Sequence, residues 1–427
     1  MSIFSIPIIA CAFALIVSPL LIFLSHSPGS AAGLMETRYE NRIFWPALAL
    51  VSVVAVALNP AFRTRTLIPP HIVYLALYLV LAGTSTVWAF APEASVTRFV
   101  QQIMVVTSIM APALLIARAP DLMRGLFVCF AFAISLSIFF VIGGYETIAD
   151  GIAIGLQGYF VGKNTLGQCA AAALLLAIHE ALYPGRRRVV GVIFAVLSVS
   201  LILFSNSKTS LGLALLVPLL AALLLMLQRT TGISPAVFPV AVVASYFVFS
   251  ALTDIQVNRL SYYLYGDSTF SGRTIIWDYV FSEIQRRPFF GWGYQSFWLV
   301  GPDGPSIVNA PGWVKFMPNA HNGYYDTILE TGYVGLILLL AFIVSTLHSI
   351  GRVSEHNPRR GWILLSLAFF VIIYNGLESL WVRGFEFLWV VFLIVAADAA
   401  RYQQTSRGGG RAPQVRRYSR ALRGQGS

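Results

Sequence analysis

The chain has 427 residues, of which 57% are hydrophobic and only 11% are charged, and its formal net charge is +11. Soluble globular domains average about 45–50% apolar and about 25% charged residues, so this composition excludes an ordinary soluble protein. The basic residues flank apolar blocks, and arginine beside a membrane explains the positive charge more simply than nucleic-acid binding does. We therefore expect no nucleic-acid partner.

The first apolar block covers residues 3–24 and contains no charged side chain. Its length is close to the roughly 20 residues that a helix needs to cross the hydrocarbon layer of a membrane. Because an unpaired backbone amide is costly in lipid, such a block must be helical. It lacks a positive leading region and an obvious cleavage site, so we interpret it as a retained helix rather than a signal peptide.

Eleven comparable blocks follow along the chain, some of them short enough to need flanking Tyr, Trp or small residues to complete a crossing. They cover residues 43–58, 71–90, 99–117, 125–142, 166–178, 189–204, 211–227, 233–252, 334–347, 362–375 and 387–397. The sequence therefore predicts an all-α fold, a polytopic transmembrane helical bundle of about 12 spans.

An even number of spans places both termini on one side of the membrane, and the charges indicate which side. With cytoplasmic termini, most of the 29 basic residues lie inside and most of the 18 acidic residues lie outside, as the positive-inside tendency requires. We expect transmembrane helices 1–9 in residues 1–252 and a large extracytoplasmic loop with short helices in residues 253–326. Transmembrane helices 10–12 follow in residues 327–400, and residues 401–427 form a basic, disordered cytoplasmic tail.

The large loop is unusually aromatic, with fifteen aromatic residues between positions 253 and 320. Aromatic faces suit the C–H surfaces of sugar rings, and we select Trp277, Trp292 and Trp298 as glycan-stacking candidates. The alternative is that these side chains form an interfacial belt or the loop's own small core.

One helix is expected within this loop. Ser271 can cap it, and Pro288 ends it. Its expected apolar face consists of Ile275, Ile276, Tyr279, Val280 and Ile284.

The chain contains three lysines, Lys163, Lys208 and Lys315, and the predicted topology places all of them outside. Lys163 and Lys208 lie at the mouths of spans, beside Asn, Ser and Thr donors. A cation near a helix start and such donors is a sensible anion site, although lysines that only anchor the span ends are equally expected.

Several motifs of the sequence together resemble those of a known family. His321-Asn322, followed by nine residues and then Gly332-Tyr333-Val334-Gly335, resembles the HN-x9-G-x-x-G signature of the O-antigen ligase and Wzy-type polysaccharide polymerase superfamily. Ser271-Gly272-Arg273 with Trp277 resembles the family's loop arginine motif, and residues 205–210 resemble its short-loop motif. In the short-loop motif Lys208 takes the place of the usual arginine. The positive charge is kept, but the bidentate hydrogen bonding of a guanidinium to phosphate is lost.

The resemblance implies a GT-C-like glycosyltransferase of the bacterial inner membrane with its active site on the periplasmic side. It would take glycan from undecaprenyl pyrophosphate without a cofactor or metal, and no Asp-x-Asp motif occurs in the loop. Its implied partners are the lipid-linked glycan, membrane lipids, a flippase and a chain-length co-polymerase. An exopolysaccharide polymerase is the favoured branch.

The chemistry assigns roles to these residues. Negative charge develops on the departing pyrophosphate, and fixed cations nearby lower the barrier. The acceptor hydroxyl must lose a proton, which an imidazole can take near neutral pH. We expect His321 to be the base, Arg273, Lys208 and Lys163 to bind pyrophosphate, and Asn322, Asp326 and Glu330 to orient the base or bind the acceptor. Asp326 and Glu330 could instead be solvated carboxylates, and Gly332 and Gly335 are expected to permit close helix packing.

Two alternatives to a polymerase remain. An O-antigen ligase would transfer glycan to lipid A-core with the same residues. A membrane transporter would also have many apolar spans, but carriers usually place ionisable residues at mid-membrane, and the span interiors here are nearly free of charge.

Overall fold

The computed structural model describes residues 5–25, 39–58, 68–116, 121–144, 155–252 and 272–407. Within these ranges the secondary structure is helical and no strand occurs. The fold class predicted from the sequence, an all-α polytopic membrane bundle, is thereby confirmed.

The first described helix runs without interruption from Ile6 to Leu24 and consists of α1, a π-helical turn and α2. The bounds of the helices are α1 Ile6–Ala12, π-turn Phe13–Val17, α2 Ser18–Leu24, α4 Tyr39–Ala57, α5 Pro70–Ser85, α6 Pro92–Leu115, α7 Leu122–Ile142, α8 Lys163–Ala181, α9 Arg186–Ser205, α10 Lys208–Thr231, α11 Val237–Leu252, α13 Arg273–Arg286, α14 Pro305–Val308, 3-10 helix η3 Gly312–Phe316, α15 Gly323–His356, α16 Pro358–Tyr374 and α17 Phe387–Arg407.

Each of the twelve predicted blocks coincides with a helical segment. Among the described residues, 7 helices are long and apolar enough to cross a membrane, and α5 is a shorter apolar helix. The seven are Ile6–Leu24, Tyr39–Ala57, Pro92–Leu115, Leu122–Ile142, Arg186–Ser205, Lys208–Thr231 and Gly323–His356. Twelve crossings therefore remain a prediction. Helix α17 continues to Arg407, so the first residues of the expected tail are helical, and residues 408–427 lie outside the described part.

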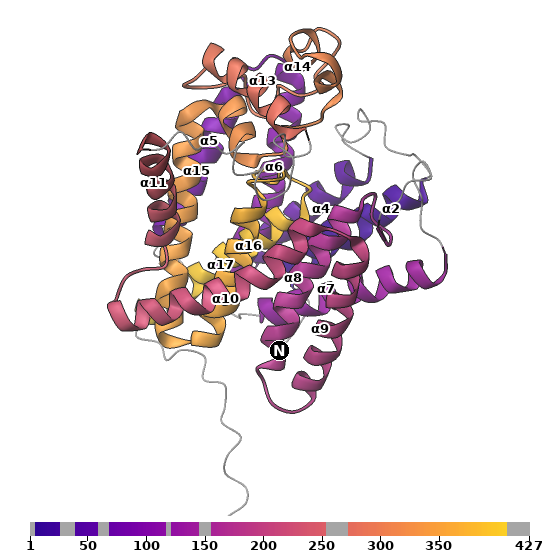
Figure 1. Ribbon diagram of the computed structural model, residues 1–427, viewed down its shortest axis with the longest axis vertical. Helices are drawn as coiled ribbons and strands as arrows, with labels where there is room; N and C mark the ends of the chain where they lie inside the picture. The colour runs from indigo at the N-terminus through magenta and orange to yellow at the C-terminus, as the bar shows by residue number, and fades with distance from the viewer. Residues whose placement is uncertain are drawn as a thin grey trace, which may run out of the picture.

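Helix α17 forms the centre of the bundle. Every residue from Phe387 to Ala400 is buried, which leaves this helix no face for lipid. A helix that is apolar on all sides is stable only when other helices surround it. Helices α6, α15 and α16 pack against it, while in Figure 1 α13 and α14 gather at one end, next to α5, α6 and α15.

The large loop has a small core of its own, as one alternative from the sequence proposed. It consists of Ile276, Tyr279, Val280, Ile284, Phe297, Trp298, Val314, Ala320, Ile328 and Leu329. The expected cap of the loop helix, Ser271, lies outside the described residues, and Gly272 precedes the first residue of the helix. Ile275, expected on the apolar face, is exposed because it lies about 100° off the face shared by Ile276, Val280 and Ile284.

Helix α15 is broken at Gly332, which has φ 69° and ψ −173°. Residues 288–293, which we call the insertion turn, enter this break. The N–H groups of Tyr333 and Val334 donate to the carbonyls of Pro288 (2.8 Å) and Phe289 (3.3 Å). The backbone N–H of Trp292 in turn donates to the carbonyl of Leu329 at 2.7 Å. The turn thus satisfies backbone groups that the break would leave unpaired inside a membrane protein.

This geometry refines the expected role of the glycines. A Cβ on Gly332 would overlap the carbonyl oxygen of Phe289 in the insertion turn, so the glycine permits close approach of a loop rather than of a second helix. Its conformation, with positive φ and extended ψ, is essentially restricted to glycine. The break fixes the loop core against the bundle and so positions the start of α15.

Candidate active site

The site is built around the first residues of α15. Asn322 caps the helix, since its Oδ1 accepts hydrogen bonds from the N–H groups of Tyr324 (3.0 Å) and Tyr325 (3.2 Å). Asparagine is among the best residues at this position because its side chain pairs amides that have no partner within the helix. His321 is therefore held directly in front of the helix start.

The backbone of His321 is in the left-handed region, with φ 48°. This conformation is uncommon outside glycine and persists only where neighbouring contacts hold it. The His321 N–H donates to Oδ1 of Asn319 at 2.9 Å, and the N–H of Gly323 donates to the carbonyl of Glu378 at 3.0 Å. The imidazole is thus aimed by a fixed backbone.

The imidazole of His321 meets the carboxylate of Glu378, which also binds Arg273. His321 Nδ1 lies 3.1 Å from Glu378 Oε2, and Arg273 Nη2 lies 3.1 Å from Glu378 Oε1. A carboxylate paired with a guanidinium is an acceptor, so this contact favours the tautomer of His321 with its proton on Nδ1, in which Nε2 can accept a proton. His321 is 31% exposed, so a substrate can reach it. The arrangement matches the base and orienting acid of a catalytic triad.

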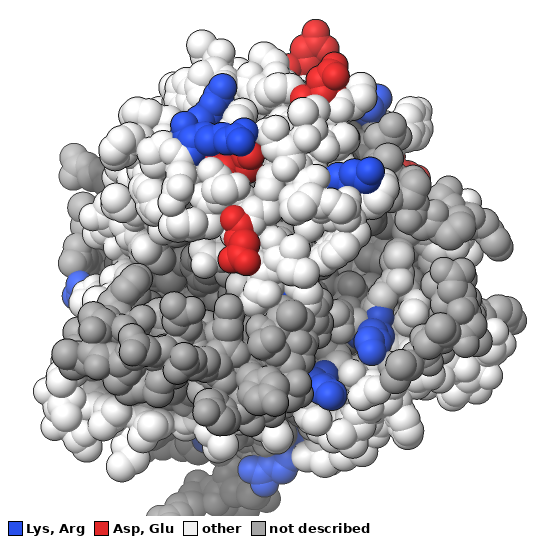
Figure 2. Space-filling model, turned by 45° about the horizontal axis from the view of Figure 1, so that its top comes forward, with Lys and Arg blue, Asp and Glu red and all other residues white. Residues whose placement is uncertain are grey.

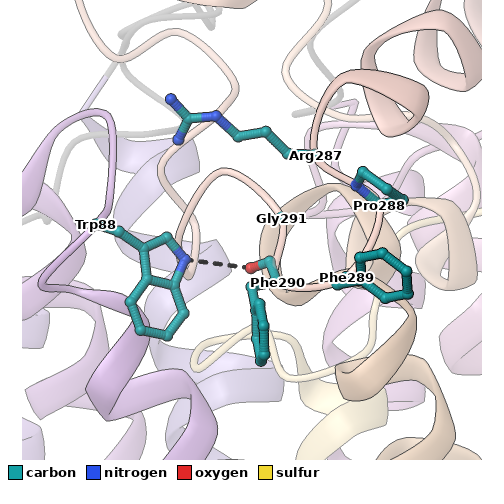
Figure 3. Close-up of a pocket in the computed structure, with 6 residues that line it drawn as sticks. All are labelled: Trp88, Arg287, Pro288, Phe289, Phe290 and Gly291. Atoms are coloured by element: carbon teal, nitrogen blue, oxygen red, sulfur yellow. Dashed lines mark hydrogen bonds between the residues drawn. The ribbon is translucent and has the colours of Figure 1, made fainter.

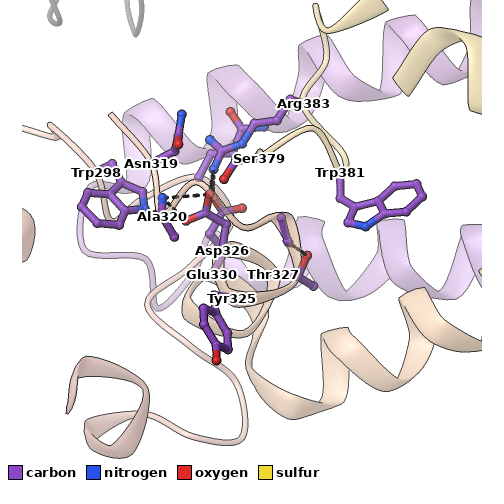
Figure 4. Close-up of polar contacts among 12 residues, drawn as sticks. Trp298, Asn319, Ala320, Tyr325, Asp326, Thr327, Glu330, Ser379, Trp381 and Arg383 are labelled. Atoms are coloured by element: carbon purple, nitrogen blue, oxygen red, sulfur yellow. Dashed lines mark hydrogen bonds and ion pairs between the residues drawn. The ribbon is translucent and has the colours of Figure 1, made fainter. Parts of the chain in front are cut away.

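A second and more buried set of charges is centred on Arg383, as Figure 4 shows. Arg383 Nη2 contacts Asp326 Oδ2 at 3.1 Å and Glu330 Oε1 at 3.0 Å. Burial alone would lower the pKa of Arg383, but the carboxylates of Glu330 and Asp326 raise it above its usual value. Both carboxylates are buried, so the alternative that they are solvated is wrong.

Asp326 supports the loop in front of His321. Its Oδ1 accepts from the indole N–H of Trp298 at 2.7 Å and from the backbone N–H of Ala320 at 3.2 Å. No contact joins it to the His321 ring within the described residues. In the structure it therefore orients the backbone that carries the base.

The short-loop motif lies at the same end of the bundle. Lys163 and Lys208 are the first residues of α8 and α10, and Gly167 packs against Ser207, which brings the two helix starts together. Ser207 donates to Ser210 at 3.0 Å. Lys208 is exposed and forms no ion pair with any described residue.

A tyrosine joins this motif to the His321 cluster. The hydroxyls of Ser210 and Tyr374 lie 3.2 Å apart. Tyr374 ends α16, and its carbonyl accepts the N–H of Glu378 at 3.0 Å. The structure thus brings the two lysine-bearing helix starts toward Glu378 but shows no contact between either lysine and Arg273.

The three candidate tryptophans pack within the loop. Trp298 is only 2% exposed, and in this conformation neither of its faces is open to a sugar. The Trp277 indole donates to the carbonyl of Ala320 at 3.0 Å, next to His321, and the Trp292 indole donates to the carbonyl of Glu283 at 3.2 Å. Trp277 and Trp292 are half-buried, so each keeps part of a face accessible.

Three charged residues of the site were not selected from the sequence. Glu378, Arg383 and Glu386 lie in the short segment between α16 and α17. The available signal was this charge cluster between two apolar blocks on the predicted outer side. Figure 2 shows that most of the described surface in this view is uncharged.

The described residues contain no group of three or more His, Cys, Asp or Glu side chains arranged to hold a metal ion. The metal-free reaction expected from the sequence stays a prediction.

The fold and the site define a polytopic helical membrane protein with a His–Glu–Arg cluster at the end of the bundle that carries the large loop. Residues 193–340 match the family model described as O-antigen ligase, a region that contains Lys208, Arg273 and His321. Together with the relatives below, this match shows that the chain is similar to the O-antigen ligase superfamily.

The relatives carry names from the same area. The exopolysaccharide production protein ExoQ of Rhizobium meliloti is 26% identical over 295 residues, which cover 64% of this chain and 63% of that protein. A protein of Rickettsia felis, provisionally named a polysaccharide ligase, is 26% identical over 137 residues, 31% of this chain and 33% of its own. The chain thus spans less than two thirds of the length of the relatives it matches.

Proposed function

We propose that this protein is a membrane glycosyltransferase that joins undecaprenyl-pyrophosphate-linked oligosaccharide units during exopolysaccharide or O-antigen polymerisation. The observation that carries the proposal is Glu378, whose carboxylate holds both the expected base His321 and the expected phosphate ligand Arg273. Similarity to the O-antigen ligase superfamily supports the same chemistry.

In the proposed reaction, Nε2 of His321 takes the proton of an acceptor hydroxyl while its oxygen attacks the anomeric carbon of the donor sugar. The bond between that carbon and the pyrophosphate oxygen breaks, and the electron pair leaves with the lipid pyrophosphate. Glu378 stabilises the imidazolium that forms, as the acid of a catalytic triad does. No metal takes part in this scheme.

The departing pyrophosphate needs fixed positive charge. Arg273 uses one amino group for Glu378, which leaves further N–H donors for phosphate oxygens. Lys163 and Lys208 stand at helix starts, where the helix dipole also favours an anion. We propose that these three cations bind the pyrophosphate from two sides.

Ligase activity is the second candidate, because the relatives from Rickettsia species are provisionally named polysaccharide ligases. The ExoQ relative, named for exopolysaccharide production, favours the polymerase. A transporter is less well supported, since the charged cluster lies at helix ends and in the loop rather than at mid-membrane.

We further propose that the protein lies in the bacterial inner membrane with both termini in the cytoplasm and the site on the periplasmic side. Reporter fusions after Gly304 should then read extracytoplasmic, and fusions after Arg411 should read cytoplasmic. The opposite result at either position would contradict this orientation.

The reaction is tested by replacing Arg273, at the start of α13, with alanine and by making the matched change Arg286→Ala at its end. Arg273→Ala should stop polymer formation while the protein still inserts, and lipid-linked repeat units should accumulate. Arg286→Ala should leave polymer near the wild-type level, because Arg286 forms its one ion pair among the described residues with Glu283. Lys208→Arg should keep activity. Normal polymer from Arg273→Ala would contradict the proposed phosphate site.

A further inference from the structure

A cavity lies away from the His321 cluster, between the end of α5 and the insertion turn. It is lined by Trp88, Arg287, Pro288, Phe289, Phe290 and Gly291 and has a volume of about 420 Å³. The indole N–H of Trp88 donates to the carbonyl of Phe290 at 3.3 Å and joins the two walls. The volume falls within the range of about 300–1,000 Å³ typical of ligand pockets.

The walls of this cavity are apolar and open outward. Phe289 is 67% exposed and Phe290 is 53% exposed. Below the insertion turn, Tyr333, Ile337 and Leu340 are also exposed, and their spacing puts them on one face of α15. Because α15 is a candidate membrane span, this face is suited to hydrocarbon. This apolar stripe begins next to the cavity, since the N–H of Tyr333 donates to the carbonyl of Pro288 in the cavity wall, and it continues along a candidate membrane span.

The rim carries one available cation. Arg287 is exposed, its guanidinium lies 4.3 Å above the ring of Trp292, and no described carboxylate pairs with it. Arg286 differs, because it pairs with Glu283 at 3.2 Å. In Figure 3 the Arg287 side chain extends to one side of the turn, while the rings of Trp88 and Phe290 point to the other. A charged end and an apolar end are thus separated.

This cavity is distinct from the proposed pyrophosphate site. Helix α13 has 14 residues, with Arg273 first and Arg286 last, and so separates the two by about 20 Å. A pyrophosphate held by Arg273 cannot reach Arg287 across that distance.

We propose that this cavity binds an anionic glycerophospholipid of the surrounding membrane. The phosphate lies on Arg287, and one acyl chain follows Phe289, Phe290 and the stripe on α15. A single unpaired guanidinium matches a phosphodiester with one negative charge, whereas a lipid pyrophosphate needs several cations. The bound lipid holds the insertion turn in the break at Gly332. This inference does not depend on the glycosyltransferase proposal.

The test is lipid retention by the purified full-length protein. The protein is delipidated in detergent and titrated with phosphatidylglycerol or phosphatidylcholine of identical acyl chains, and bound lipid is counted by native mass spectrometry. Wild type should retain phosphatidylglycerol preferentially. Arg287→Gln should weaken that retention about fivefold, the effect of one cation near a membrane surface. Arg286→Gln, the matched control, should not change it.

Arg287→Lys separates loss of charge from loss of packing, because it keeps the cation and removes the planar group over Trp292. It should retain the preference for phosphatidylglycerol. Equal retention of both lipids by wild type, or unchanged retention by Arg287→Gln, would overturn the proposal. Displacement of phosphatidylglycerol by an equal amount of undecaprenyl phosphate would also overturn it, since the occupant would then be the carrier lipid.

Discussion

Replacing Glu378 with glutamine tests how the base is prepared. Glutamine keeps the size of the side chain but offers one acceptor oxygen and one donor group. Arg273 can only donate, so the amide oxygen turns toward it and the amide N–H₂ faces His321. The imidazole must then accept through Nδ1, and its proton moves to Nε2, where it blocks the proposed base.

The magnitude follows from this change of tautomer. Loss of a general base costs about 10²–10⁴ in rate, and the comparable acid-to-amide change in a catalytic triad costs about 10⁴. Because His321, Arg273 and the backbone carbonyl of residue 378 stay in place, donor binding should change little. We expect a fall of about 10²–10⁴ in kcat with KM near the wild-type value.

The assay is transfer by purified protein with a lipid-linked oligosaccharide donor, measured at several pH values. Glu283→Gln is the control, since Glu283 is a buried carboxyl of the large loop, in α13, and its Oε2 has no hydrogen-bond partner among the described residues. Burial raises the pKa of Glu283, and its carboxyl group pairs with Arg286 rather than with His321 or Arg273, so Glu283→Gln should leave the transfer rate near the wild-type value. Glu378→Asp should restore part of the activity.

A Glu378→Gln protein with wild-type kcat would refute the tautomer argument. Equal losses from Glu378→Gln and Glu283→Gln would show instead that this end of the protein does not tolerate a change from carboxyl to amide.

Two further predictions concern the framework of the site. Gly332→Ala should destabilise the protein by about 2–6 kcal/mol, from about 1–3 kcal/mol of backbone strain and about 0.5–1.5 kcal/mol for each of two lost hydrogen bonds. Gly312→Ala, at another positive φ but in open space, should cost much less, and thermal unfolding in detergent compares the two. Burial raises the pKa of Glu386 to about 7 in the folded protein, which therefore binds this proton more tightly than the unfolded protein does. The resulting stabilisation of the folded state is complete below the unfolded pKa and is lost as the pH rises through about 7. Thermal unfolding of Glu386→Gln should lack this pH dependence, and an unchanged profile would contradict the assignment.

Sequence patterns were sufficient for the architecture because apolar length alone decides whether a segment can cross a membrane. They also singled out His321 and Arg273, through motif spacing and their place beside the loop. Neither pattern could reveal that both side chains meet Glu378, which is 57 residues from His321 and 105 from Arg273. Such pairing depends on how α13, α15 and α16 pack.

The same limit applies to the aromatic loop residues and the glycines. Composition marked Trp298 as unusual but could not separate a sugar platform from a core side chain, and burial in the loop core decides between them. Spacing marked Gly332 but could not reveal that the insertion turn occupies its place. Local rules gave the helices, and the long-range contacts required the folded chain.

The most direct test of the account is transfer by His321→Ala in a purified assay with lipid-linked substrate. His321 begins the segment in front of α15, is accessible, and is oriented by Glu378. The variant should reach the membrane in near wild-type amount and bind donor, yet lose about 10²–10⁴ in transfer rate, with or without a chelator. Retention of more than about a tenth of the wild-type rate would contradict the account, because loss of the base should leave at most about a hundredth of that rate.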